Sequence, residues 1–148
     1  MGVKMYIEKL RDYLKDKPIN EKFSFIFDLG HDVNFIKEVF PDDIRTFEDL
    51  KFNPHRVVPG GVQAYLEFDN GHFASVVGGP KLYGDGETSF ELGFPYKGSI
   101  DVMGWLNPDE ITEEMIKIQA KSPEFLNQNK DEWRRNKKAY LGLGNILF

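Results

Sequence analysis

Four polar side chains have the chemistry for proton transfer or ligand binding, and they form two groups along the chain. Asp69 and His72 lie on either side of a predicted turn, and Asp85 and Glu87 lie in a later loop. A carboxylate beside an imidazole can act as a general acid–base pair. Together the four could line a ligand pocket beside the loop 78–87, as in a small enzyme or a ligand-binding domain. We favour a plainer interpretation of Asp69 and His72, a solvated polar pair across two strands.

Other catalytic and cofactor motifs find no support in the sequence. The glycine-rich loop 78–86 follows a predicted strand, but it lacks the GxxxxGK[ST] spacing and no helical pattern follows it. The three histidines have no HxH or HExxH spacing, there is no cysteine, and no serine sits in a GxSxG elbow. We therefore expect no cofactor and no metal, and we favour a protein that is not an enzyme.

Charge is distributed unevenly along the chain. Seven acidic residues lie in residues 28–49 and eight in residues 85–114, the latter with Lys97 as the single base. Basic residues gather near the C-terminus around Trp133, and this set is a candidate protein-binding surface: Trp133, Arg134, Arg135, Lys137 and Lys138. Solvated helix faces explain the same pattern more plainly. The net charge of -5 disfavours direct nucleic-acid binding.

A β-meander is the element that must position the first four side chains. Apolar and polar residues alternate from Val62 to Asp69, which is typical of a half-buried strand. Asn70-Gly71 then predicts a two-residue type I′ turn, because both residues tolerate positive φ. Strands are expected again at 72–77, 88–94 and 99–103, with a turn at 96–98. The sequence therefore predicts an antiparallel meander of three to four strands over about residues 61–103.

Helices are predicted on both sides of this meander. An apolar stripe predicts a helix over 3–14, and a second helix should begin after Asp32 and stop before Pro41. Between them, alternating Phe residues at 23–27 predict a short strand. Thr46 and Asp49 resemble a capping box. Asn107-Pro108 begins a helix that buries Ile111, Met115 and Ile118, and a last helix is expected from Ser122 to about Tyr140.

These elements predict a single α+β domain over residues 1–148. Helices would flank an antiparallel sheet. No apolar run reaches the ~20 residues that a membrane helix needs, and the N-terminus lacks a secretory pattern. We expect a protein without a membrane segment.

Residues of the meander also carry a resemblance to known proteins. The pattern runs from Asn70-Gly71 through Ser75-Val76-Val77 to Tyr83-Gly84-Asp85-Gly86, and continues in Asp101–Leu106. Over roughly residues 61–120 the chain resembles small phage and prophage proteins of unassigned function. That family has no established catalytic residues, so the resemblance implies none here. It implies an accessory protein made in a bacterial cytoplasm that acts on a host protein.

The function that we expect is therefore a non-enzymatic protein-binding accessory module, such as a phage-encoded inhibitor or modulator of a host protein. One alternative is the small enzyme or ligand-binding domain with a polar pocket near the loop 78–87. Another is an acidic mimic of DNA, which would require the two acidic segments to form one continuous face.

Overall fold

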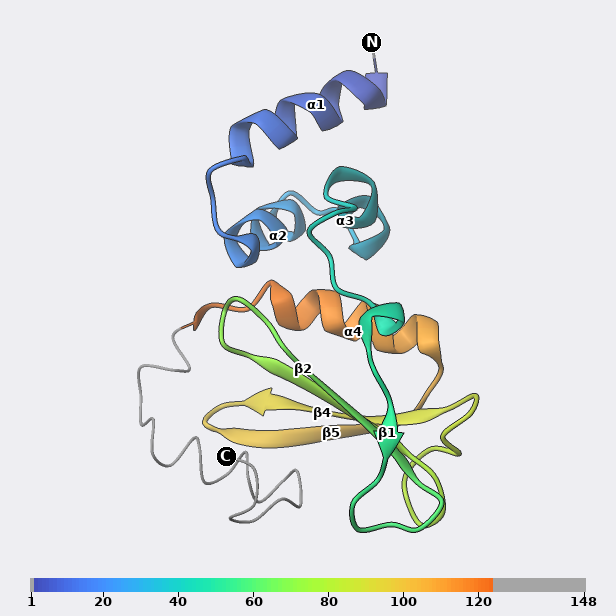
Figure 1. Ribbon diagram of the computed structural model, residues 1–148. Helices are drawn as coiled ribbons and strands as arrows, with labels where there is room; N and C mark the ends of the chain where they lie inside the picture. Colours follow the sequence, from blue (N-terminus) through green and yellow to red (C-terminus); the bar gives the residue numbers. More distant parts are fainter. Residues whose placement is uncertain (1, 124–148) are drawn as a thin grey trace.

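Helices precede and follow a single antiparallel sheet. The computed structural model describes residues 2–123 (Figure 1). The predicted last helix, with Trp133 and its basic neighbours, lies outside these residues. The elements follow in the order α1 (Gly2–Leu14), α2 (Ile19–Asp28), α3 (Val33–Val39), the short 3-10 helix η1 (Phe47–Asp49), β1 (Asn53–Pro54), β2 (Val62–Glu67), β3 (Phe73–Gly78), β4 (Phe90–Tyr96), β5 (Ser99–Leu106) and α4 (Pro108–Gln119).

The sheet is the predicted meander with one additional strand. Its five strands lie in the order β1-β2-β3-β4-β5, and every neighbouring pair is antiparallel. The added strand is the two-residue β1, which pairs with the start of β2. The α+β prediction is thereby confirmed. Within residues 2–123 no helix is long and apolar enough to cross a membrane.

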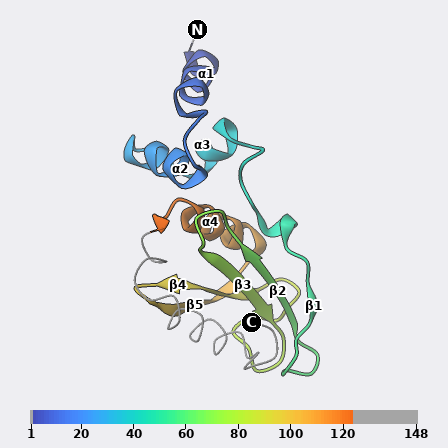
Figure 2. The same ribbon diagram turned by 60° about the vertical axis from the view of Figure 1, so that its left-hand side comes forward.

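Helix α4 lies between two layers and contributes to the core of each. It packs across one face of the sheet, and α1, α2 and α3 lie on its other side (Figures 1 and 2). Ile111, Met115 and Ile118 belong to the core that α4 forms with the strands. Ile116 belongs to the core of the N-terminal helices. The predicted buried side of this helix is confirmed.

The helix starts that were predicted from local capping residues are confirmed. Asp32 accepts a hydrogen bond from the Phe35 N–H at 3.1 Å and caps α3. Asn107 and Glu110 form a reciprocal capping box at the start of α4, with distances of 2.8 and 3.0 Å. The Thr46–Asp49 box before η1 is also present. Each cap satisfies N–H groups that the first helical turn leaves without partners.

The predicted strand at residues 23–27 is wrong, because these residues lie in α2. Phe23 and Ile26 are buried at helical spacing against the other helices. Phe25, on a different side, packs against Tyr13 of α1 with ring centroids 5.3 Å apart. When a helix is buried on two sides, apolar residues are needed on both sides. They can then fall at alternate positions in the sequence, which resembles the two-residue period of a strand.

The predicted hairpin at Asn70-Gly71 is present, but its two-residue type I′ turn is wrong. The Gly71 N–H donates to Phe68 O at 2.9 Å and the Phe68 N–H to His72 O at 2.9 Å. Gly71 has φ +83°, whereas Asn70 is not among the residues with positive φ. The loop is therefore the three-residue kind, in which a turn is followed by a left-handed glycine. The two-residue turn occurs at Lys97-Gly98, with φ of 49° and 77°.

Candidate protein-interaction surface

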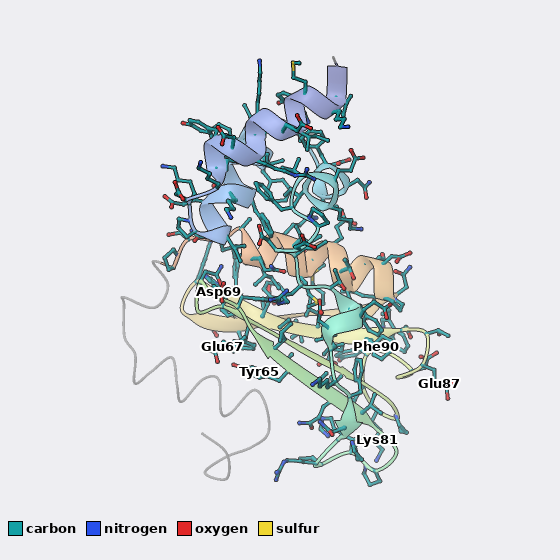
Figure 3. The ribbon with its side chains drawn as sticks, turned by 45° about the horizontal axis from the view of Figure 1, so that its top comes forward. Tyr65, Glu67, Asp69, Lys81, Glu87 and Phe90 are labelled. Carbon is teal, nitrogen blue, oxygen red and sulfur yellow. The ribbon has the colours of Figure 1, made fainter. Side chains whose placement is uncertain are left out.

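The four predicted polar residues do not come together. Asp69 and His72 lie in the β2–β3 hairpin loop, before β3 begins. Asp85 and Glu87 lie in the loop that follows the other end of β3, and Figure 3 places Asp69 and Glu87 at separate ends of the sheet. The ligand pocket that these residues would have lined is not formed by them.

His72 joins the hairpin to the end of α4. Its side chain is buried, and its Nε2 lies 2.9 Å from the Ser122 carbonyl oxygen. Burial lowers the pKa of His72, and nearby Lys121 adds to this, while the Ser122 contact opposes it. Asp69 is exposed and lines a small cavity of about 40 Å³ together with Asn70 and Gln119. The predicted pair is therefore divided between a buried junction and the protein surface.

Asp85 closes its own loop. Its carboxylate accepts hydrogen bonds from the backbone N–H groups of Glu87, Thr88 and Ser89 at 2.7–3.0 Å, and from the Thr88 hydroxyl at 2.7 Å. The Thr88 hydroxyl and then these N–H groups hold the pKa of Asp85 far below its ordinary value. Glu87 is exposed on the same loop. A carboxylate with so many intramolecular donors organises the loop.

This ordered loop holds Tyr83 beside Trp105, and both rings face solvent. The backbone N–H of Trp105 donates to the backbone carbonyl of Tyr83 at 2.8 Å. The backbone N–H of Tyr83 donates to the Glu91 carboxylate at 3.2 Å. A Cβ atom on Gly104 would come within 2.6 Å of Tyr83 Cβ, so glycine permits this close approach. Tyr83 and Trp105 are each 63% exposed. We call these two residues the aromatic pair.

A strained bulge in β5 directs Trp105 outward. Phe90 pairs with Leu106 and Leu92 pairs with Met103, so β5 has one more residue than β4 in this interval. Trp105 has φ +58°. A bulky side chain rarely adopts this left-handed conformation, and such strain persists where the surrounding structure enforces it. Bulges commonly re-aim a side chain in this way.

The aromatic pair was not among the residues predicted from the sequence. The last strand was predicted to end at Met103, whereas β5 continues to Leu106. Val102 and Leu106 are apolar residues on either side of Gly104-Trp105. A glycine inside a strand pattern is the signal that could have revealed the bulge. The basic C-terminal candidates, Trp133 to Lys138, lie outside the described part of the chain.

The described residues offer little support for a metal site. Within residues 2–123 no three His, Asp or Glu side chains lie close enough together to hold a metal ion.

Comparison of the chain with protein-family models, curated proteins and solved structures finds no match. The candidate site therefore stands on its own geometry.

Proposed function

We propose that this protein is a non-enzymatic protein-binding module whose partner docks on the aromatic pair, Tyr83 and Trp105. The observation that carries the proposal is the strained backbone that holds the Trp105 ring in solvent. Burying this ring in the protein's own core would release apolar area from water. A costly conformation that keeps it exposed is consistent with selection for binding.

The residue types and the rigidity of the site also favour binding. Trp and Tyr are among the side chains that most often dominate the energy of protein interfaces. The Asp85 hydrogen bonds order the loop that carries Tyr83 before any partner arrives. Less conformational entropy is then lost on association.

The resemblance to phage and prophage proteins supports a bacterial host protein as the partner, and hence a cytoplasmic site of action.

The two other candidate functions, a polar ligand pocket and a DNA mimic, have weaker support. Separation of Asp69 from Glu87 removes the motivation for the polar pocket. Several acids that a DNA mimic would display serve local structure instead, such as Asp32, Asp49 and Glu110 in helix caps.

Site-specific photo-crosslinking in bacterial cells tests the proposal. A benzophenone amino acid replaces Tyr83 or Trp105, and the matched control carries it at Tyr13 of α1, which is 64% exposed. We expect the same crosslinked protein from positions 83 and 105 and not from position 13. Equal crosslinking at all three positions, or none at 83 and 105, would refute the aromatic pair as a docking surface.

A substitution that relieves the strain gives a second test. Trp105→Asn introduces a residue that tolerates positive φ. It also removes a ring that is largely exposed. We expect the free energy of unfolding to rise by about 1 kcal/mol, while crosslinking from position 83 is lost. Urea unfolding measures the first effect. A variant that is less stable than the wild type would show that Trp105 serves the fold.

A further inference from the structure

The outer edge of β5 lies beside the aromatic pair. β5 is the last strand in the sheet order, and it has 8 residues. Among residues 2–123, no strand pairs with its outer side. An edge of this length offers backbone N–H and C=O groups to an added strand.

The turn at Lys97-Gly98 determines which backbone groups of β5 point outward. In a two-residue hairpin the residues that flank the turn, Tyr96 and Ser99, exchange hydrogen bonds with each other. Because bonded and non-bonded pairs alternate, Ile100 and Val102 direct their N–H and C=O groups away from β4. One hydrogen bond supports this assignment. The Val102 N–H donates to the side chain of Asp101 at 2.9 Å.

Exposed apolar side chains accompany this edge. Among residues 2–123, ten large hydrophobic residues are at least 40% exposed. Four of them lie on β4, on β5 or in the adjoining loop: Tyr83, Tyr96, Val102 and Trp105. Tyr96 lies at the Lys97-Gly98 end and the aromatic pair at the other. An extended segment along β5 would thus meet apolar groups at both ends as well as hydrogen-bonding groups between them.

We infer that the outer edge of β5 binds an extended, basic segment of the partner protein as an additional strand. This inference rests on the proposed function and specifies its partner and its mode. Main-chain hydrogen bonds to Ile100 and Val102 give affinity, and side chains that reach Trp105 and Tyr96 give specificity.

Charge determines the chemistry of the added segment. An incoming carbonyl takes the Val102 N–H from Asp101, so this carboxylate loses one hydrogen bond and keeps the electrostatic attraction of Lys121. A donor on the incoming strand would replace the lost bond. Arg or Lys provides such a donor. A second copy of this chain is disfavoured, because its β5 would bring another Asp101 beside the first.

The probe is a displayed library of random peptides of about twelve residues, long enough to span the strand. Peptides are selected on the wild-type protein, and amide hydrogen exchange is measured with and without the best binder. In the free protein we expect rapid exchange at Ile100 and Val102. With the peptide bound we expect slow exchange at both, and we expect Arg or Lys to be enriched among the selected sequences.

Ile100→Pro tests the mode directly. Proline removes an outward N–H, which an edge strand tolerates, while Ile100→Val keeps it as the matched control. We expect peptide affinity to fall about tenfold or more in the proline variant and to stay unchanged in the valine variant. Circular dichroism verifies that both variants fold. If the proline variant does not fold, amide exchange in the wild-type protein still tests the inference.

Four results would overturn the inference. One is a selected peptide that leaves the Ile100 and Val102 amides unprotected, and another is a library without basic enrichment. The third is slow exchange at both amides in the free protein, since another part of the chain would then occupy the edge. The fourth is crosslinking from position 105 that Ile100→Pro does not weaken. In that last case the proposed function stands and only strand addition fails, whereas absence of crosslinking rejects both.

Discussion

Gly71 and Trp105 share a left-handed backbone conformation for opposite reasons. Gly71 has φ +83° in a hairpin loop, where the lack of a Cβ atom makes the conformation inexpensive. Trp105 has φ +58° in a bulge, where a bulky residue raises its cost. At the first position the residue type suits the fold, and at the second the fold imposes a strained conformation on the residue. This contrast separates a structural requirement from a candidate function.

Gly71→Val should destabilise the protein by about 1 kcal/mol or more, because a β-branched residue resists positive φ. Gly71→Asn is the control, since Asn tolerates the left-handed region and should cost less. Urea unfolding of the three proteins gives the difference in free energy. Equal stability of the valine variant and the wild type would contradict the turn geometry.

His55 should make stability depend on pH. Its Nδ1 accepts hydrogen bonds from the N–H groups of Val57 and Val58 at 3.1 and 3.0 Å, which requires that nitrogen to be unprotonated. Burial lowers the pKa of His55 below its ordinary value of 6.5, although Glu91 partly opposes this. The stabilisation is therefore complete above pH 6.5 and is lost as the pH falls through the lower, folded-state pKa.

Thermal unfolding between about pH 8 and about pH 5, the range in which histidine titrates, tests this prediction. The melting temperature should fall toward pH 5, and His55→Asn, which keeps an acceptor that does not titrate there, should reduce the fall. Burial also lowers the pKa of His72, so part of the dependence should remain in this variant. An unchanged pH profile in His55→Asn would remove His55 from the explanation.

At the scale of elements, the sequence predicted what depends on neighbours in the chain. The capping box of Asn107 and Glu110 needs residues three apart, and it was found. The strand predicted at Phe23–Phe27 failed because α2 is buried on two sides, against the preceding helix α1 and in a core that includes Ile116 of α4, which is distant in sequence. The aromatic pair was missed for the same reason, since Tyr83 and Trp105 meet only after β4 and β5 pair.

Asn70 shows most clearly which contacts could not be predicted from the sequence. Its identity suggested a turn residue, but its Nδ2 donates to the carbonyl oxygens of Ile118 and Lys121 at 2.9 Å each. Its Oδ1 accepts the His72 N–H at 3.1 Å. The side chain therefore fastens the hairpin to the C-terminal end of α4. Nothing in the neighbouring sequence specifies that contact.

Asn70→Asp should lower the free energy of unfolding by about 1–3 kcal/mol, because buried carbonyls lose their donor. The aspartate can still accept from His72, but its charge is unfavourable beside a helix C-terminus. Asp69→Asn, at the exposed neighbouring position, should stay within about 0.5 kcal/mol of the wild type. Chemical denaturation compares them. Similar losses in both variants would argue against the α4 contact.

At the scale of the whole molecule, α4 links two cores that would otherwise be separate. One contains the N-terminal helices and Ile116, and the other contains the sheet with Ile111, Met115 and Ile118. Ile116 is fully buried. Adjacent residues of one helix thus serve opposite layers, which should couple the unfolding of the two.

Ile116→Ala should cost about 2–5 kcal/mol and should accelerate amide exchange in both α3 and β3. The increase in β3 follows from coupling through α4, since Ile116 itself packs against the helices. Met115→Ala provides the reciprocal control, because Met115 packs against the sheet. Faster exchange confined to α3 would mean that the two layers open independently.

The position of Ile116 also affects how the chain folds as it leaves the ribosome. The helices α1–α3 are complete at residue 40, yet their core includes a side chain from residue 116. At about 5–20 residues per second, synthesis of the intervening chain takes roughly 4–15 s. During that interval Phe23, Ile26 and Ile36 lack one wall of their core. These three helices, which are synthesised well before residue 116, are therefore a natural client for a nascent-chain chaperone.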